Sequence, residues 1–251
     1  MIGRRPEAGF GSRMVLTPRQ RASWLAHLWK AITQQHHTAL RPMFAGHVGR
    51  DAVVIDIGAH AGQFAKLFAR MAPDGAVYAF EPSAYARSVL APAVRFNRLR
   101  NIEIVPLGLS DHIEARVLHT PLKRHASLGF GIAHLGEGAA IERAVDQLVG
   151  LTTLDAFIID RGIDRVDLIK ADIEGWELRA LKGGEETLKR FRPALYLEID
   201  EACLVRAGDT PADVFGWLSS LGYRGFATPD LTPAPRPAGA GDYLFTAEQS
   251  A

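Results

Sequence analysis

The chain has 251 residues, of which 47% are hydrophobic and 23% are charged, so it can bury one substantial core and fits one α/β domain with additions. Its net charge of +1 excludes a strong overall attraction to nucleic acid or to an anionic membrane, and its single cysteine, Cys203, excludes an internal disulfide and a zinc site built from several cysteines. No segment has the uninterrupted apolar length of a transmembrane helix, and the first residues lack the apolar core of a signal peptide, so we expect a cytoplasmic protein.

Residues 1–50 are expected to form a basic extension with one amphipathic helix. They contain eight arginine and lysine residues against one acid, Glu7. The segment Thr17-Pro18-Arg19-Gln20 is typical of a helix start, and residues before about 15 are expected to be disordered. The apolar side chains that follow at helical spacing are Trp24, Leu25, Leu28, Trp29 and Ile32. This face packs either over the sheet domain or against a second copy in a homo-oligomer, and the positive charge leaves a contact with RNA open.

An apolar run that breaks into a glycine turn opens the predicted main domain, residues 51–251. Residues 53–57 have the β-branched character of a strand that is buried on both faces of a parallel sheet. The turn itself is Gly58-Ala59-His60-Ala61-Gly62, and its glycines let backbone approach a ligand without a Cβ in the way. The apolar residues that follow at helical spacing are Phe64, Leu67, Phe68 and Met71. A strand, a glycine turn and a helix N-terminus form one half of a nucleotide site.

The other half is expected at the end of the next strand, residues 76–80, which leads directly into Glu81-Pro82. An acid at the carboxyl end of this strand can accept hydrogen bonds from both hydroxyls of a ribose. The spacing between Gly58 and Glu81 suits a strand, a crossover helix and a second strand. It does not by itself decide which nucleotide is bound.

Two kinds of nucleotide site compete at this turn. A dinucleotide fold requires G-x-G-x-x-G, whose middle glycine clears space for a pyrophosphate. Here that position carries His60, and Asp56 would lie badly beside phosphates but well beside an ammonium group. D-x-G-x-x-x-G, followed by a strand that ends in an acid, resembles the S-adenosylmethionine site of class I methyltransferases. A nicotinamide-binding oxidoreductase, a non-catalytic nucleotide-binding module and an ordinary turn of another α/β protein remain as alternatives.

A helix and a third strand come next. Pro92 is expected to kink or restart the helix that follows Glu81, and residues 101–106 have the pattern of the third strand. Ser110 and Asp111 then lie in a turn at the same edge of the sheet. In this fold that edge flanks the adenine, so both are candidates for contact with adenine nitrogens, although a plain polar turn explains them equally well.

Residues 112–150 are the least regular part and are expected to form a hairpin insertion that acts as a lid. Residues 113–120 are the first strand, and residues 141–151 pair with it. A long loop inside a compact domain is usually functional or disordered. The candidate substrate contacts on this loop are His125, Ser127 and His134. A solvated side chain is the plainer explanation of each histidine.

The most specific pattern begins at Leu151-Thr152-Thr153-Leu154-Asp155, which opens a helix. A strand follows, and it ends in Asp172-Ile173-Glu174-Gly175-Trp176-Glu177. Together with the earlier turn and acid, these motifs resemble the FkbM-type methyltransferases, whose pattern contains D-x-G-A-x-x-G, an acid before proline, T-L-D and D-L-I-K-x-D-x-E-G-x-E-x-x-L-K-G. The resemblance covers roughly residues 50–247, and His60 stands where the family commonly has asparagine.

The resemblance implies a Rossmann-like class I methyltransferase fold, with a mostly parallel twisted sheet, helices on both faces and a final antiparallel strand. It also implies S-adenosylmethionine as the cofactor and O-methylation of a sugar, a glycan or a small natural product. The residues that match the cofactor site are Asp56, Gly58, His60, Gly62, Glu81, Pro82, Ser110, Asp111 and Asp172. An RNA methyltransferase that uses the basic extension remains an alternative.

Three carboxylates are expected to meet at the carboxyl edge of the sheet. Residues 193–199 form the fifth strand, which brings Glu198 toward Asp172 and Glu174. A hydroxyl acceptor needs a base, for which Asp172 or Glu174 is the first candidate and Glu198 the second. The same carboxylates could hold a divalent cation that lowers the pKa of the hydroxyl, which leaves direct and metal-assisted deprotonation open. Structural roles are also open, because Glu174 could cap the following helix and Asp172 could hold backbone amides.

The remainder completes the sheet. Thr210-Pro211-Ala212-Asp213 starts a helix that Gly222 ends. Residues 223–227 and 242–246 are expected to form a final antiparallel pair, joined by a proline-rich loop over residues 229–241.

Overall fold

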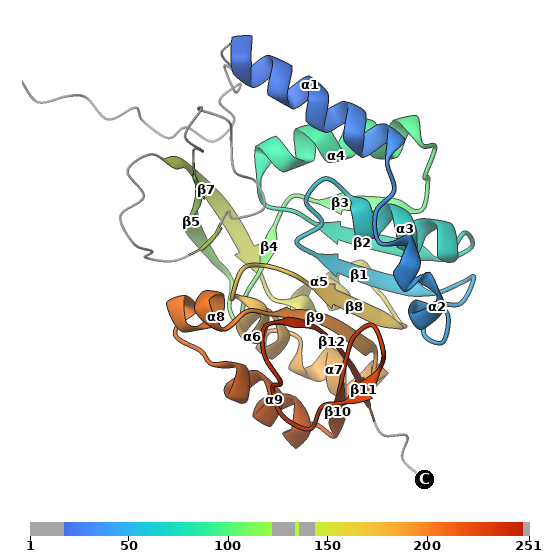
Figure 1. Ribbon diagram of the computed structural model, residues 1–251, viewed down its shortest axis with the longest axis vertical. Coiled ribbons are helices and arrows are strands. Elements are labelled where there is room, and N and C mark those ends of the chain that lie inside the picture. Colours follow the sequence, from blue (N-terminus) through green and yellow to red (C-terminus); the bar gives the residue numbers. More distant parts are fainter. Residues whose placement is uncertain (1–17, 122–133, 136–143, 248–251) are drawn as a thin grey trace, which may run out of the picture.

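The computed structural model describes residues 18–121, 134–135 and 144–247, and a twisted eight-stranded sheet lies at its centre (Figure 1). Its strands are β1 (Val53–Ile57), β2 (Ala76–Phe80), β3 (Ile102–Val105), β8 (Leu168–Ala171), β9 (Ala194–Ile199), β10 (Tyr223–Ala227), β11 (Thr232–Pro233) and β12 (Gly241–Ala247). Their spatial order is β11-β10-β12-β9-β8-β1-β2-β3. The strands from β9 to β3 run parallel, whereas β12 runs antiparallel to β9 and β10. The expected parallel sheet with a final antiparallel pair is confirmed.

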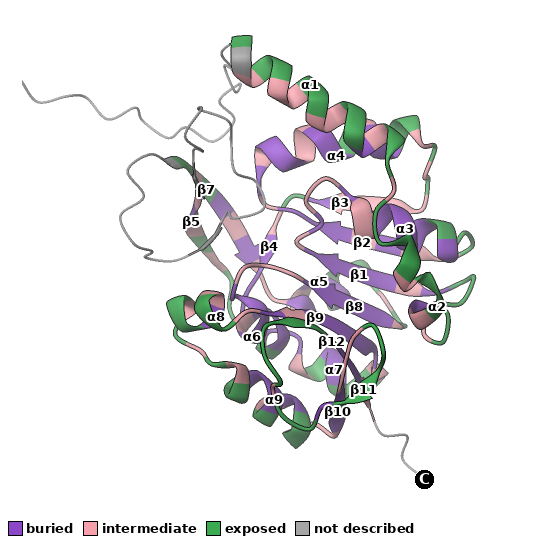
Figure 2. Cartoon of the chain, in the orientation of Figure 1, coloured by how far each residue is buried: buried purple, intermediate pink, exposed green. Residues whose placement is uncertain are grey.

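Both faces of the central strands are buried (Figure 2). Successive side chains of a strand point to opposite faces, so Val54 joins the apolar cluster on one face and Ile55 joins the cluster on the other. Tyr196 and Leu195 on β9 divide in the same way. This double burial explains why the sequence shows continuous apolar runs rather than an alternating pattern.

One face is covered by α3 (Gln63–Met71) and α4 (Ala84–Phe96), together with the short η1 (Thr38–Leu40) and α2 (Arg41–Phe44). Phe44 is fully buried there, with its ring centroid 5.1 Å from that of Phe68 and 5.0 Å from that of Tyr196. The residues immediately before position 51 therefore belong to the same core as the sheet, although sequence reasoning placed them in the extension.

The N-terminal helix α1 (Pro18–Thr33) lies along α4 (Figure 1). Trp24, Leu28 and Ile32 pack against the buried side chains of α4, and the indole Nε1 of Trp24 donates to Ser88 Oγ at 2.9 Å. The predicted packing of this helix over the sheet domain is confirmed. Leu25 and Trp29, however, are 58% and 68% exposed, so only part of the predicted stripe is used. Self-association through this helix stays a prediction.

The other face is covered by five helices: α5 (Leu154–Arg161), α6 (Glu177–Lys182), α7 (Glu185–Phe191), α8 (Glu201–Ala207) and α9 (Pro211–Ser220). Two expected helix starts are confirmed by their caps. Thr153 Oγ1 accepts from the amide of Ala156 at 3.1 Å, and Thr210 forms a reciprocal capping box with Asp213.

A smaller sheet, of β4 (Gly108–Leu109), β5 (Glu114–Pro121), β6 (His134–Leu135) and β7 (Ala144–Thr152), stands beside the carboxyl ends of the central strands (Figure 1). β5 pairs antiparallel with β7 along its whole length, so the predicted hairpin is confirmed as a strand pair. Its role as a lid stays a prediction. His125, Ser127 and the predicted disordered start of the chain lie outside the described residues, and His134 is described only by its backbone pairing with His119.

Two local expectations were wrong. α4 continues through Pro92 without interruption, because Leu90 and Ala93 on either side of it are fully buried and tertiary packing outweighs the lost backbone hydrogen bond. The proline-rich loop also contains β11, which pairs with β10. Within the described ranges, no helix combines the length and apolar character that crossing a membrane requires.

Candidate functional site

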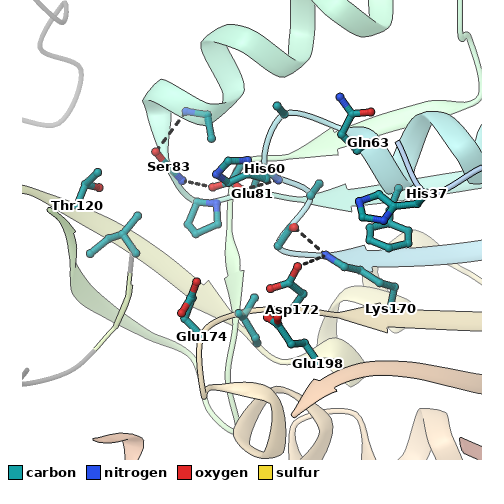
Figure 3. A pocket seen from close by; sticks show the side chains of 18 of the residues that line it. His37, His60, Gln63, Glu81, Ser83, Thr120, Lys170, Asp172, Glu174 and Glu198 are labelled. Atoms are coloured by element: carbon teal, nitrogen blue, oxygen red, sulfur yellow. Dashed lines mark hydrogen bonds and ion pairs between the residues drawn. The ribbon is translucent and has the colours of Figure 1, made fainter. Parts of the chain in front are cut away.

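A cavity of about 400 Å³ opens where β1, β2, β8 and β9 end (Figure 3). Seven of the predicted site residues line it, namely Gly58, His60, Glu81, Pro82, Asp172, Glu174 and Glu198. The parallel strands bring these residues together because their carboxyl ends meet at one edge of the sheet. The size of the cavity is within the range of small-molecule and cofactor sites.

The glycine turn between β1 and α3 forms one wall. Gly58 and Gly62 have φ of 74° and 82°, and His60 also has a positive φ, 53°. A Cβ on Gly58 would lie 2.2 Å from the carbonyl oxygen of Asp172, and one on Gly62 would lie 2.3 Å from Leu90 Cδ1. The expected role of these glycines, backbone approach to a ligand, is therefore not what requires them. They admit a left-handed turn and close packing on neighbouring backbone and α4, and Gly62 does not line the cavity.

Glu81 lies beside this turn, next to His60, and is almost fully buried (Figure 3). Its Oε2 accepts from the amide of His60 and its Oε1 from the amide of Ser83, each at 2.8 Å. Burial raises the pKa of Glu81, while the nearby His60 and these amides oppose the shift. Each carboxylate oxygen retains further acceptor capacity, so Glu81 can also accept from ligand hydroxyls.

Lys170 links the residues at the base of the cavity through ion pairs and a hydrogen bond. Its Nζ is 3.3 Å from Asp56 Oδ1 and 3.7 Å from Asp172 Oδ2, and it donates to the carbonyl oxygen of Gly58 at 2.9 Å. Burial disfavours its charge, but attraction to Asp56 and then to Asp172 raises the pKa of Lys170. Asp56 is fully buried and lies outside the cavity lining, so its place is beneath the turn rather than against a ligand.

Asp172, Glu174 and Glu198 converge as expected (Figure 3). Asp172 and Glu198 are hydrogen-bonded to each other, and this bond, together with burial, raises the pKa of Glu198 to about 8. Burial works against the charge of Asp172, but Lys170 and the bond to Glu198 hold the pKa of Asp172 below its ordinary value. At neutral pH the pair thus consists of an ionised Asp172 and a protonated Glu198.

Glu174 has a different environment. Its backbone has φ of 57°, Arg206 donates to its carbonyl oxygen at 3.2 Å, and Cys203 Sγ lies 3.3 Å from its Oε2. Burial raises the pKa of Glu174. The loop amides are held by Glu177 instead, whose Oε1 accepts from Ile173 at 2.8 Å and from Gly175 at 3.3 Å. The helix α6 has no side-chain cap, so the capping role that remained possible for Glu174 is not observed.

Several lining residues were not predicted. They are His37, Gln63, Ser83, Leu118, Thr120, Lys170 and Asp242. His37 stacks on Phe64, with ring centroids 4.2 Å apart and planes 15° apart, and no local motif marks it. Asp242 is the cross-strand partner of Glu198, so correct pairing of the two strands would have found it.

Ser110 and Asp111 do not line the cavity. Ser110 is fully buried and donates to Asp111 Oδ1 at 3.1 Å, and Asp111 also pairs with His112 at 2.7 Å. A contact with adenine stays a prediction for both. Among the described residues, no group of three or more histidine, cysteine, aspartate or glutamate side chains is arranged to hold a metal ion.

Comparisons with known proteins agree on a family. The model of the methyltransferase FkbM domain matches residues 56–224. Methyltransferase sdnD from Sordaria araneosa is 28% identical over 156 residues, which are 53% of this chain and 60% of that protein. The 2-O-methyltransferase NoeI from Sinorhizobium fredii is 27% identical over 160 residues, with 57% and 61% of the two chains covered. The chain thus spans about three fifths of the length of these relatives.

Two solved structures share the fold. The methyltransferase FkbM from Methylobacillus flagellatus KT superposes with a TM-score of 0.52 at 16% identity, covering 89% of this chain and 59% of that one. Cofactor-bound Rv0187 from MTB superposes with a TM-score of 0.53 at 12% identity, covering 94% and 92%.

Proposed function

The chain belongs to the FkbM family of methyltransferases, and from this premise we propose that it transfers a methyl group from S-adenosylmethionine to a hydroxyl group of a sugar or small natural product. Its Rossmann-like sheet is that of class I methyltransferases. The main support for this proposal is that one cavity brings together Glu81, which lies against the glycine turn, and the three carboxylates Asp172, Glu174 and Glu198.

The donor set of the cavity fits this cofactor. Glu81 is placed to accept from ribose hydroxyls at the end of β2, and the turn that starts at Gly58 lies between it and Asp172. Asp172, kept ionised by Lys170, supplies negative charge for an ammonium or a sulfonium group. His60 occupies the position that a pyrophosphate would need, which disfavours the nicotinamide alternative.

Bound S-adenosylmethionine would supply an electrophilic methyl group on a positively charged sulfur. The protein must then remove the acceptor proton. Glu198 is already protonated at neutral pH, and Asp172 is a weak base because Lys170 stabilises its charge. Burial raises the pKa of Glu174, so its carboxylate is a stronger base than that of Asp172. We therefore assign proton removal to Glu174.

The acceptor class rests on the chemistry of the remaining lining. Glu174, Glu198 and Asp242 offer carboxyl groups to hydroxyl donors, and His37 adds an imidazole. The name of one relative, a 2-O-methyltransferase, agrees with a hydroxyl acceptor.

Calorimetric titration of the purified protein with S-adenosylhomocysteine tests the cofactor, with NADH titrated in parallel. Micromolar affinity for S-adenosylhomocysteine and none for NADH is expected. Glu81→Gln should weaken the binding because the amide cannot accept from both ribose hydroxyls, and a thermal melt checks that the variant is folded. Binding of NADH alone would overturn the proposal.

The acceptor is tested by transfer of a labelled methyl group from S-adenosylmethionine to a panel of methyl glycosides, flavonoids and short RNA oligonucleotides. Labelling of a hydroxyl compound is expected. Labelling of RNA alone would replace the proposal with the nucleic-acid alternative.

A further inference from the structure

The side-chain amide of Gln147, on β7, hydrogen-bonds the hairpin of β5 and β7 to residues 82–84. We call these residues the cofactor loop, because they directly follow Glu81. Gln147 Oε1 accepts from the amide of Ala84 at 3.0 Å, and its Nε2 donates to the carbonyl oxygen of Pro82 at 3.2 Å. The two partners are 63 and 65 positions away along the chain, so this contact joins separate parts of the fold. Both functions of one amide are used, which fixes its orientation.

The loop that Gln147 holds is the one that presents Glu81. Ser83 lies between the two contacts, and its amide donates to Glu81 Oε1 at 2.8 Å. The amide of Ala84 is the first of α4 and has no partner within the helix, so the hairpin satisfies an otherwise orphaned donor. A shift of the hairpin would therefore break two hydrogen bonds to the segment that positions Glu81, the residue proposed to bind the ribose.

The hairpin also forms part of the cavity wall. Leu118, the cross-strand partner of Gln147, lines the cavity together with Thr120. On the same strand the guanidinium of Arg116 lies 5.2 Å from the ring centroid of Trp176, in the loop that follows Glu174. One side chain on this hairpin thus contacts residues 82–84, two others line the cavity, and Arg116 contacts the loop that follows Glu174.

We propose that Gln147 is a positioning residue that couples cofactor binding to the arrangement of the acceptor wall. A ligand that requires the Pro82 to Ala84 backbone in its present geometry also favours the hairpin position that Gln147 shares with it. The coupling is reciprocal, so the hairpin strengthens cofactor binding to the degree that the cofactor orders the hairpin. Cofactor binding thus favours the arrangement of the hairpin residues that line the cavity. This inference rests on the proposed function.

Hydrogen–deuterium exchange of the full chain, with and without S-adenosylhomocysteine, tests the coupling. In the wild type, the ligand is expected to slow exchange in β5 and β7 as well as in the turn at Gly58. Gln147→Leu removes both hydrogen bonds, so the ligand should still protect the turn but no longer the hairpin. Its dissociation constant should rise about three- to tenfold, which corresponds to the loss of about one net hydrogen bond.

The matched control is Asp146→Asn, on the neighbouring residue of the same strand. Asp146 pairs with His119 across the hairpin at 2.7 Å, and its side chain points to the face opposite to that of Gln147 because the two are successive residues of a strand. It should retain ligand-dependent protection of the hairpin. If Gln147→Leu does not fold, Gln147→Glu keeps the acceptor for Ala84 and loses the donor to Pro82, and an intermediate effect is expected.

Equal ligand-dependent protection of the hairpin in wild type and Gln147→Leu would overturn the inference, because the ligand would then order the hairpin without this amide. Loss of protection in Asp146→Asn as well would also overturn it, since any weakening of the hairpin would suffice. A wild type that does not bind S-adenosylhomocysteine would instead refute the proposed function.

Discussion

The three converging carboxylates differ in the work they can do, although they lie at one edge of the sheet. Asp172 forms an ion pair with Lys170, and Glu198 carries a proton at neutral pH. Glu174 contacts the thiol of Cys203, and burial raises its pKa. A shared location therefore leads to separate roles in charge stabilisation, proton storage and proton removal.

Glu174→Gln removes the proposed base but keeps the shape of the side chain. Turnover of the acceptor found with the labelled panel is expected to fall about 10²- to 10⁴-fold, the usual contribution of general base catalysis. The affinity for S-adenosylhomocysteine should change less than about threefold, because Asp172 retains its charge. Steady-state kinetics and calorimetry measure the two effects, with the exposed Glu201→Gln as control. Normal turnover in Glu174→Gln would show that its carboxylate is not the base.

The proton on Glu198 makes stability depend on pH. Between its ordinary pKa of 4.5 and the raised value of about 8, the folded chain holds this proton and the unfolded chain does not. The contribution of Glu198 to the free energy of unfolding therefore falls as pH rises through that range. Glu198→Gln keeps a hydrogen-bond donor toward Asp172 at every pH. It should therefore gain about 1–2 kcal/mol relative to wild type between pH 5.5 and pH 8.5, which is less than the full pKa shift would give because Glu198 is only half-buried and solvent screens its charge.

Urea denaturation at these two pH values measures the difference, again beside Glu201→Gln. Parallel stability curves for wild type and Glu198→Gln would mean that the pair does not share a proton.

In helix α4, tertiary packing outweighs the tendency of a proline to interrupt a helix. Pro92 lies inside the helix and cannot donate to the carbonyl oxygen of Ser88 one turn earlier. The buried faces on both sides of it, at Leu90 and Ala93, hold the helix together. The proline is thus tolerated at a cost rather than required.

Pro92→Ala should restore the missing backbone donor. We expect a gain of about 1–2 kcal/mol in the free energy of unfolding, since the recovered helix energy exceeds the added flexibility of the unfolded chain. Chemical denaturation measures it, and Ala91→Gly on the exposed neighbouring position should have the opposite sign by about 1 kcal/mol. A destabilised Pro92→Ala would show that the proline shapes the helix on which Gln147 and α1 depend.

Across the whole molecule, the features that sequence could predict are those with local causes. The strand before Gly58, the acid at Glu81 and the meeting of Asp172 with Glu198 follow from apolar runs and from the rule that parallel strands end at one edge. His37 and Asp242 reach the same cavity through a left-handed turn and an antiparallel pairing. Neither of these long-range arrangements has a signature in the flanking residues.

The function of the glycines illustrates the same limit. The sequence correctly predicted that residues 58 and 62 need freedom from a Cβ, but not what the Cβ would meet. Asp172 and Leu90 come from elements more than 25 residues further along the chain, so only the packed fold identifies them. Local sequence predicts backbone conformation better than it predicts the neighbours that make that conformation necessary.

The role of the N-terminal helix α1 can be tested, because a structural role and an RNA-binding role predict different results. Lys66 is fully buried and donates to the carbonyl oxygens of Ala31 and Gln34 at the end of α1. Deletion of residues 1–33 would expose the apolar face of α4 and remove one of these partners. We expect Tm to fall by roughly 10 °C.

The affinity for S-adenosylhomocysteine should change little in this truncated chain, because His37 and the cavity remain. Trp29→Ser, on the exposed side of α1, is the matched control and should leave Tm unchanged, since that side chain is 68% exposed. Binding of a fluorescent RNA should be weak in both the full and the truncated chain. An unchanged Tm, combined with salt-sensitive RNA binding that disappears on truncation, would mean that the basic helix serves a nucleic-acid partner rather than the stability of the fold.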